Sequence, residues 1–368
     1  MSLNIQNIAY KQDLQTVAES DFIPWHKLTN KSLLLTGATG LIGSFLTDVL
    51  MYRNEHYGSN ITVYAVSRNM ESAKERFKEY LGNSLFRYVQ HDVSEKPAFD
   101  FKADFIIHSA SNAAPAAYVA DPAGTLKANV FGVDNLLAYS VNAHSERVLY
   151  VSSGEVYGEG NGEDFVETYS GYVDCMNPRA CYPSGKRAAE TLCASYVVQY
   201  GVDVVVARPC HIYGATITQS DNRAFAQFIR NVLSKKDVVL KSKGEQYRSY
   251  CYVADCVSAM LTILLKGEKG NAYNIANKQS NVTVAELAKT IATAGGQQVT
   301  FDLPADEEKR GYSVVTRAAL NADKLEKLGW QARYTLKEGV EKTIQILFNN
   351  EINKRLFAQS FAGKEYVS

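Results

Sequence analysis

The chain has 368 residues, of which 46% are hydrophobic and 21% charged, as in an ordinary globular protein. Its 39 Lys and Arg residues balance its 39 Asp and Glu residues, so no net charge attracts nucleic acid or an anionic membrane. No apolar run approaches the roughly 20 residues that span a bilayer. The length predicts one large domain with a smaller one, in which local groups must hold any anionic ligand.

The cysteines and the start of the chain indicate the compartment. None of the six cysteines belongs to a Cys-x-x-Cys pair or lies in a His cluster, which disfavours a disulfide framework and a zinc site. Acidic residues interrupt the N-terminus, so it lacks the apolar region of a secretory signal. We expect a cytoplasmic protein with reduced thiols and no bound metal.

Short apolar strands alternate with helices from residue 32 to residue 207. We predict strands at 33–35, 61–66, 86–89, 105–107, 148–151 and 202–207, and helices at 41–51, 70–81, 122–143 and 182–200. This alternation is typical of βαβ crossovers and of a parallel sheet that helices cover on both faces. We therefore predict an α/β fold with a Rossmann-type, doubly wound parallel sheet.

The regular alternation breaks up after about residue 208. Short strands and helices of mixed order are expected there, for example at 237–240, 273–275 and 282–295. We predict an N-terminal extension at 1–30, whose apolar residues pack on the body of the protein. The sheet domain is expected at 31–207, with some later segments returning to it, and a smaller mixed α/β substrate domain at 208–368.

A glycine-rich turn, Gly37-Ala-Thr-Gly40-Leu-Ile-Gly43, follows the first strand and opens a helix. Glycines let the backbone turn tightly and approach a pyrophosphate, while the helix N-terminus offers free N–H groups. The spacing is one residue longer than the dehydrogenase fingerprint, and a purely structural turn is the alternative. In this strand–turn–helix context we predict that residues 31–207 bind a dinucleotide.

The second strand ends in Ser67-Arg68, without the carboxylate that usually binds the adenosine ribose of NAD. Arg68 suits the 2′-phosphate of NADP, although a solvated surface arginine is the alternative. NADP is therefore favoured and NAD stays open. Besides the three glycines, Ser67 and Arg68, the candidate cofactor contacts are Thr39, Leu41, Ile42, Asp92, Val93, Ser109, Ala110, Ser111, Asn129, Tyr182, Lys186 and Arg208.

Tyr182 and Lys186 lie four residues apart and so share one face of a predicted helix. A tyrosine, with a pKa of about 10, is a poor base at neutral pH. A lysine ammonium one turn away favours the phenolate, and the charge of an oxidised nicotinamide would add to this effect. Such a pair also arises by chance in a chain with 23 tyrosines.

Ser153 supplies the context that the Tyr–Lys pair alone lacks. It follows the strand at 148–151 directly, which predicts a position at the carboxyl edge of the sheet. A hydroxyl there can hydrogen-bond the same substrate oxygen that Tyr182 deprotonates. We predict Ser153, Tyr182 and Lys186 as catalytic residues, with loop capping as the alternative for Ser153. Glu155 is a fourth catalytic candidate or a surface carboxylate.

Taken together, these residues resemble the extended short-chain dehydrogenase/reductases that act on nucleotide sugars, the NAD-dependent epimerases and dehydratases. The resemblance covers roughly residues 32–335 and is closest to the UDP-glucuronate decarboxylases (UDP-xylose synthases). Residues 108–129 and 179–193 run parallel to that group without a gap. It implies that Ser153 and Glu155 match the group's hydroxyl and glutamate. The other substrate contacts that the resemblance implies are Ala113, Pro115, His211, Arg223, Arg248, Arg310 and Arg317, with surface salt bridges as the alternative for the arginines.

The resemblance implies roles for some of these groups, and three departures qualify them. Arg317, thirteen residues before Trp330, matches an arginine thought to meet the sugar carboxylate. Gly154 stands where the group has a second hydroxyl, and the acidic residue after the second strand is missing. His211 replaces an asparagine expected near the substrate diphosphate, with a structural histidine as the alternative. These changes leave the sugar, the cofactor and the decarboxylation step open.

The function implied is oxidation of a nucleotide sugar at C4 with transient hydride transfer to NAD(P). A UDP-glucuronate decarboxylase-like reaction is favoured, while 4-epimerisation and 4,6-dehydration are alternatives. Gly154 before Glu155 argues against a dehydratase, which usually has an Asp-Glu pair. A non-catalytic NADP-binding regulatory protein is the alternative from another class. The helices at 122–143 and 182–200 lie where this family forms a four-helix interface, which implies a homodimer.

Overall fold

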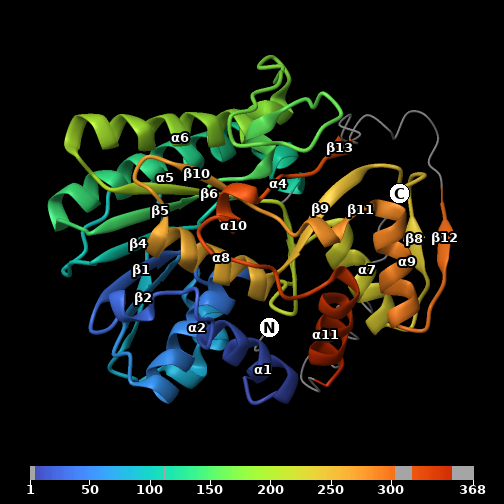
Figure 1. The fold of residues 1–368 in the computed structure, drawn as a ribbon, viewed down its shortest axis with the longest axis horizontal. Coiled ribbons are helices and arrows are strands. Elements are labelled where there is room, and N and C mark those ends of the chain that lie inside the picture. Colours follow the sequence, from blue (N-terminus) through green and yellow to red (C-terminus); the bar gives the residue numbers. More distant parts are fainter. Residues whose placement is uncertain (1–4, 112, 114, 303–316, 350–368) are drawn as a thin grey trace.

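The computed structural model describes residues 5–349 except for 112, 114 and 303–316. Its centre is a seven-stranded parallel sheet with the strand order β10-β6-β5-β4-β1-β2-β3 (Figure 1). The strands are β1 (Ser32–Thr36), β2 (Thr62–Ser67), β3 (Phe86–Gln90), β4 (Phe105–His108), β5 (Arg147–Val151), β6 (Val204–Pro209) and β10 (Ala272–Ile275). The strand order reverses between β1 and β4, and such a switch point forms a ligand crevice at the carboxyl ends of the strands.

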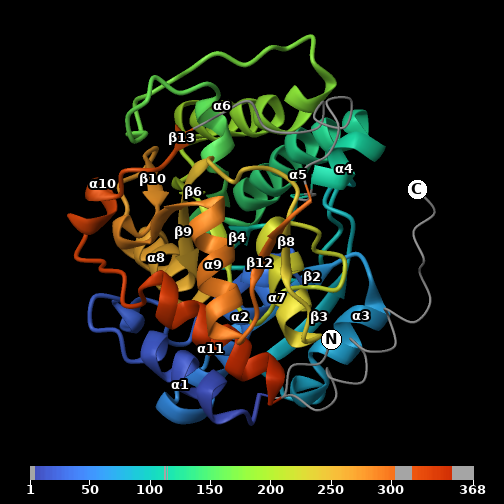
Figure 2. The ribbon, with the colours of Figure 1, turned by 90° about the vertical axis from the view of Figure 1, so that its right-hand side faces the viewer.

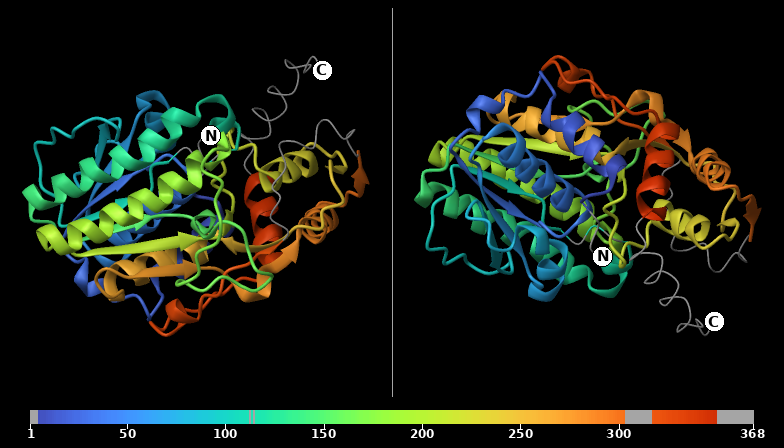
Figure 3. Two further views of the ribbon diagram at one scale, coloured as in Figure 1. Left: turned by 90° about the horizontal axis from the view of Figure 1, so that it is seen from above. Right: turned by 90° about the horizontal axis from the view of Figure 1, so that it is seen from below.

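Helices cover both faces of this sheet. On one face lie α5 (Pro122–Ala143) and α6 (Cys181–Tyr200), and on the other α2 (Leu41–Tyr57) and α8 (Val253–Lys266), as Figures 1 and 3 show. Leu33 and Leu35 of β1 pack in the apolar cluster of α2 and α8, whereas Leu34 packs in that of α5 and α6. Successive side chains of a strand point to opposite faces of the sheet. Because helices cover both faces, all three residues are fully buried. This double burial explains the uninterrupted apolar run that predicted the strand.

A smaller body stands beside the carboxyl ends of the sheet strands (Figure 1). Its central strand is β9, which pairs with β11 in antiparallel and with β7 and β13 in parallel register. The elements of this body are β7 (His211–Tyr213), α7 (Ala224–Leu233), β8 (Val238–Leu240), β9 (Tyr247–Tyr252), β11 (Asn281–Thr283), α9 (Val284–Ala294), β12 (Val299–Phe301), β13 (Arg317–Ala318) and α11 (Leu336–Phe348). The short helix α10 (Asp323–Glu326) lies between β13 and α11 in the chain.

Two expected elements differ from the structure. The strand expected at 273–275 in the smaller body is β10 of the main sheet, where it pairs with β6. The helix expected at 70–81 is divided into α3 (Met70–Arg76) and the 3-10 turn η2 (Lys78–Tyr80). Phe77, between them, leaves helical geometry with φ −112° and ψ 20°. Its buried ring packs on Phe86 at a centroid distance of 5.2 Å, so tertiary packing overrides the helical pattern.

The N-terminal extension packs on the body, as predicted. Ile23 and Trp25 are buried, and helix α1 (Ile8–Ala18) lies against α2, α8 and α11 (Figure 2). The Tyr10 hydroxyl donates to Asp48 of α2. The fully buried Asp13 carboxylate accepts hydrogen bonds from Tyr252 and Tyr334 and forms an ion pair with Lys342. Helix α1 therefore links the cofactor-side helix α2 to α11 of the smaller body.

Among the described residues, no helix combines the length and apolar character needed to cross a membrane. All six cysteines are free. Within the same part of the chain, no group of three or more His, Cys, Asp or Glu residues is arranged to hold a metal ion.

Candidate active site

The glycine turn lines the crevice between β1 and β4. Gly37 has a φ of +70°, and a Cβ added there would lie 2.8 Å from the backbone nitrogen of Ala110. A Cβ on Gly43 would lie 2.3 Å from the Gly37 carbonyl oxygen. Gly40 is the N-cap of α2 and has no side chain to cap it, so the first N–H groups of the helix are left for an anionic ligand. Three further candidates lie in this turn and are partly buried: Thr39, Leu41 and Ile42.

Hydrogen bonds fasten the loop after β4 to the end of β1. The Ser109 hydroxyl donates to the Thr36 carbonyl at 2.6 Å, and the Ala110 N–H donates to the Thr36 hydroxyl at 3.3 Å. The Ser111 hydroxyl donates to the Asn129 side-chain oxygen at 2.9 Å, and Asn129 is buried in α5. The candidate cofactor residues of β4 and α5 are therefore brought next to the glycine turn, where they suit a dinucleotide.

The end of β2 forms the outer rim of the crevice. Ser67 is buried, and Tyr88 donates to its carbonyl at 3.0 Å. The Arg68 side chain is 64% exposed, and its guanidinium lies 4.0 Å from the Asp92 carboxylate. Val93 is buried behind this pair. The rim thus offers a solvent-accessible guanidinium at the position where β2 ends.

Ser153, Tyr182 and Lys186 are brought together at the carboxyl end of β5. Ser153 caps the 3-10 turn η3 (Gly154–Tyr157), and Tyr182 and Lys186 begin α6. The Lys186 ammonium donates to the Val151 carbonyl at 2.9 Å and lies 5.7 Å from the centre of the Tyr182 ring. Burial lowers the pKa of Lys186 to about 7. The three predicted residues therefore form one cluster at the edge of the crevice.

The surroundings of Tyr182 shift its pKa in both directions. Burial and the negative charge of Glu155 raise its pKa to about 12. Hydrogen bonds with Ser153 and Tyr118 and the charge of Arg223 act in the opposite direction. Deprotonation of Tyr182 near neutral pH therefore needs further positive charge close to the phenol oxygen.

A buried column behind the cluster was not predicted from the sequence. The Tyr150 ring lies 5.8 Å from the His108 ring and 4.9 Å from the Lys186 ammonium. His108 shares a 2.7 Å hydrogen bond with the Thr36 hydroxyl. Burial and the charge of Lys186 lower the pKa of His108 to about 3, so its imidazole is neutral at physiological pH. His108 and Tyr150 lie on strands β4 and β5, whose other residues are largely apolar, so the sequence pattern did not single them out.

Glu155 and Arg179 form a forked ion pair beside Tyr182. The two guanidinium nitrogens donate to the two carboxylate oxygens at 3.0 and 3.2 Å. Arg179 lies in the 3-10 turn η4 (Pro178–Ala180) and is 5.8 Å from the centre of the Tyr118 ring. Tyr118, in α4 (Pro115–Ala120), stacks on Tyr182 at 4.7 Å. Arg179 and Tyr118 were missed as site residues, although both lie in the runs that carry the family resemblance.

Three of the arginines predicted for substrate binding belong to the smaller body. Arg223 is paired with Asp221 at 2.6 Å, and Arg317 is paired with Asp164. Arg248 is buried on β9, and its guanidinium donates to the adjacent Tyr247 carbonyl at 2.9 Å. The pairing of Arg317 with Tyr247 places β13 beside β9, the strand that carries Arg248.

His211 faces the same group of arginines from β7. Desolvation of the ring and the charges of Arg248 and Arg223 lower the pKa of His211 to about 4, although the residue as a whole is exposed. The ring lies 5.5 Å from that of Tyr250 on β9. His211 is therefore neutral at physiological pH and can donate or accept one hydrogen bond in the cleft.

The remaining candidates differ in their surroundings. Ala113 is exposed in the loop before α4, Pro115 begins α4, and Arg310 lies outside the described residues. Arg208 donates to both oxygens of Glu190, and also to the Tyr157 hydroxyl and the Glu167 carbonyl. Through these bonds Arg208 connects β6 to α6 and to the segment at 157–167. Its contact with the cofactor remains a prediction.

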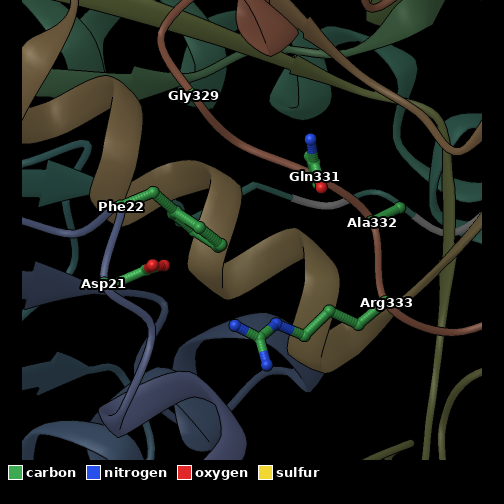
Figure 4. Close-up of a pocket in the computed structure, with 6 residues that line it drawn as sticks. All are labelled: Asp21, Phe22, Gly329, Gln331, Ala332 and Arg333. Carbon is green, nitrogen blue, oxygen red and sulfur yellow. The ribbon is translucent and has the colours of Figure 1, made fainter.

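A surface hollow of about 710 Å³ lies apart from these residues. It is lined by Asp21, Phe22, Gly329, Gln331, Ala332 and Arg333. Figure 4 shows the side chains of Asp21, Phe22 and Arg333 around one space between the N-terminal segment and the loop before α11. None of its lining residues belongs to the crevice or to the cluster around Tyr182.

Comparison with known proteins identifies the group to which this arrangement belongs. Residues 33–276 match the NAD dependent epimerase/dehydratase family. The chain belongs to this family. It is 34% identical over 339 residues to UDP-glucuronic acid decarboxylase 1 of Xenopus tropicalis, covering 92% of this chain and 75% of that protein. It is 32% identical to UDP-glucuronic acid decarboxylase 6 of Arabidopsis thaliana, covering 85% of this chain and 87% of that protein.

Solved structures share the fold at lower sequence identity. The dTDP-glucose 4,6-dehydratase of Bacillus anthracis, in complex with NAD, has a TM-score of 0.74 at 22% identity and covers 89% of this chain and 99% of its own. Epimerase Mth375 of Methanothermobacter thermautotrophicus has a TM-score of 0.78 at 20% identity, covering 92% and 98%. The predicted Rossmann-type fold and family are confirmed.

Proposed function

We propose that this chain is a nucleotide-sugar enzyme that oxidises its substrate at C4 and acts most nearly as a UDP-glucuronate decarboxylase. The observation that carries the proposal is the cluster of Ser153, Tyr182, Lys186 and Glu155 at the carboxyl end of β5. It lies at the same end of the sheet as the glycine turn, and the charge of Arg223 acts on Tyr182. The identity of the curated relatives supports the choice among the reactions of the family.

NADP or NAD fits the crevice on the side of β1. A bound nicotinamide would supply a reversible hydride acceptor for the sugar carbon. Gly37 and Gly43 let the turn pack tightly on backbone atoms of the protein, and Gly40 leaves the first N–H groups of α2 uncapped for a pyrophosphate. We propose that Arg68 contacts a 2′-phosphate and that NADP is preferred, since no carboxylate ends β2. Release by heat denaturation, followed by mass spectrometry of the supernatant, identifies the dinucleotide, and NAD alone would contradict the preference.

Tyr182 is proposed as the base that removes the O4 proton of the sugar, while the Ser153 hydroxyl holds the same oxygen. The pKa of Tyr182, raised to about 12 by burial and by Glu155, must fall for this step. Lys186 lies one helical turn away and supplies positive charge when protonated. Hydrogen bonds from Ser153 and Tyr118 add to this stabilisation of the phenolate.

Decarboxylation follows from the position of the 4-keto group. A sugar that carries a carboxylate on C5 becomes a β-keto acid once C4 is oxidised. Its C5–C6 bond can then break, with the electron pair delocalised onto the C4 oxygen and CO2 released. Ser153 and Tyr182, which hold this oxygen, also stabilise the negative charge that forms on it. Protonation at C5 and reduction at C4 complete the cycle.

The test is a panel of UDP-, dTDP-, GDP- and CDP-sugars whose products are followed by mass spectrometry. We expect UDP-glucuronate to lose the mass of CO2, and the Tyr182→Phe variant to leave it unchanged. Loss of the mass of water from a neutral sugar would instead indicate a dehydratase. An isomer of unchanged mass would indicate an epimerase. If no sugar of the panel is converted, the enzymatic assignment is overturned.

The organisation of the chain is part of the proposal. We propose that residues 31–207, with later segments such as β10, bind the cofactor, and that 208–368 mainly bind the substrate. We also propose a cytoplasmic homodimer that pairs α5 and α6, where Leu126, Phe131 and Val198 are exposed. Light scattering at micromolar concentration tests the dimer, and a monomeric mass would contradict it.

A further inference from the structure

The forked ion pair between Arg179 and Glu155 has no evident structural purpose. Both side chains are partly exposed, Arg179 to 43% and Glu155 to 37%. Exposed ion pairs contribute little to stability, because water solvates each charge almost as well. An arginine whose partner is a carboxylate in a cleft can therefore exchange that partner at small cost.

The pair borders the reacting centre. Glu155 lies two residues after Ser153, and its charge raises the pKa of Tyr182. Arg179 lies over Tyr118, whose ring is stacked on Tyr182 at 4.7 Å with an interplanar angle of 18°. A group bound to Tyr182 through O4 therefore has Glu155 and Arg179 within its immediate surroundings.

A sugar carboxylate that enters here meets a charge problem. The negative charge of Glu155 repels a second carboxylate. The Arg223 side chain makes three hydrogen bonds to Asp221 and a fourth to the Ile212 carbonyl, and the Arg317 side chain makes one to Asp164. Arg179 differs from both in its position, because it lies on the Tyr118 ring that stacks on Tyr182, and its partner Glu155 acts on the pKa of Tyr182.

We propose that Arg179 is the specificity residue for the carboxylate of the substrate, with Glu155 as its resting partner. The guanidinium fork turns from Glu155 to the sugar carboxylate, which it matches with the same two parallel hydrogen bonds. A neutral sugar offers no such partner and leaves the pair closed. The inference rests on the proposed function for its substrate class, and it assigns recognition to a residue 24 positions from Glu155 in the chain.

The experiment measures binding by calorimetry, with UDP-glucuronate and UDP-glucose as probes and the enzyme as purified. Arg179→Met keeps an apolar stem and removes the fork, so UDP-glucuronate should bind about 10- to 100-fold more weakly while UDP-glucose is nearly unaffected. Glu155→Gln removes the competing partner, so UDP-glucuronate should bind several-fold more tightly, about 3-fold or more. A residue that merely supported the fold would not produce this opposite pair of changes.

Two further variants keep the outcome interpretable. Arg179→Lys retains the charge without the fork and should lose part of the affinity for UDP-glucuronate, which reports on the variant site if Arg179→Met unfolds. Arg317→Met removes the rival arginine. Equal weakening of both sugars by Arg179→Met, or selective loss of UDP-glucuronate by Arg317→Met alone, would overturn the proposal.

Binding separates this proposal from the proposed function. If the enzyme turns over no UDP-glucuronate but Arg179→Met loses affinity for it selectively, the proposed function fails and the role of Arg179 stands. If decarboxylation occurs and Arg179→Met binds both sugars as the unchanged enzyme does, the role of Arg179 fails and the function stands. An unchanged enzyme that binds no UDP-glucuronate contradicts the role of Arg179 as well.

Discussion

The two halves of the candidate active site are built from different materials. The cofactor half is made of backbone, since Gly37 and Gly43 have no room for a Cβ and the bare N-terminus of α2 faces the crevice. The substrate half is made of charged side chains, and Arg179, Arg223 and Arg317 are each paired with a carboxylate. A backbone cradle is fixed before its ligand arrives, whereas a paired arginine is neutralised until a ligand anion replaces its partner.

The largest effect is expected at the junction of the two halves. Tyr182→Phe should lower kcat by about 10³-fold, because general base catalysis is lost while the ring remains. The stacking on Tyr118 at 4.7 Å should keep the fold and the bound cofactor unchanged. Steady-state kinetics with the converted sugar, together with the cofactor content of the purified variant, check both parts. A kcat within a factor of about two of the original would remove Tyr182 from the mechanism.

A methyl group added to the glycine turn should weaken binding of the dinucleotide. Gly43→Ala places a Cβ 2.3 Å from the Gly37 carbonyl oxygen, so the turn must shift. We expect dinucleotide affinity to fall by about 10- to 100-fold, as overpacking of a rigid site does. Gly58→Ala at the other end of the same helix is the control for backbone strain without a clash, because its φ is +58° and an added Cβ meets no atom within 4 Å. Equal cofactor content in the two variants would contradict a rigid cradle.

A charge on the rim should have a smaller effect. Arg68→Ala removes the exposed guanidinium at the end of β2, and we expect affinity for NADP to fall by about 10-fold while affinity for NAD changes little. Titration of protein freed of its dinucleotide with each cofactor measures the ratio. Equal losses for both would assign Arg68 to the shared part of the dinucleotide.

The last prediction concerns the stability of the fold and a buried acid outside both halves. Asp255 of α8 accepts hydrogen bonds from the N–H groups of Arg333 and Tyr334, and burial raises its pKa to about 7. The folded protein then holds a proton that the unfolded chain releases, so stability falls as pH rises from about 4 to 7. The decline should be on the order of 4 kcal/mol over this range, or about 1.4 kcal/mol per pH unit. Asp255→Asn should flatten it, as denaturant unfolding at pH 5 and pH 8 would measure, and an unchanged slope would exclude Asp255 as its source.

The contrast between the halves also explains what could be predicted. The glycine turn and the Tyr182–Lys186 pair are local patterns, because a tight turn and one helical turn each dictate the spacing of their residues. Arg179 meets Glu155 across 24 positions, and Tyr118 meets Tyr182 across a segment that includes α5 and β5. No local period encodes such contacts, since the strand ends bring them together only after the sheet has formed.

Two further differences have the same origin. The segment at 272–275 looks like a strand of the smaller body, but the parallel pairing with β6 depends on α8, which returns the chain to the main sheet. Arg208 follows the end of the strand predicted at 202–207 and so looks like a ligand contact, but it lies within β6. In the structure, its guanidinium forms an ion pair with Glu190 of α6.

Helix α1 has a consequence for biosynthesis. Asp13 leaves the ribosome early, yet its partner Tyr334 follows 321 positions later. At a synthesis rate of about 5–20 residues per second, roughly 15–60 seconds separate the two. The nascent chain must carry this carboxylate in a solvated state for that interval, and it can be buried with its partners only when the end of the described chain has emerged. The first helix to be made is thus among the last to reach its final surroundings.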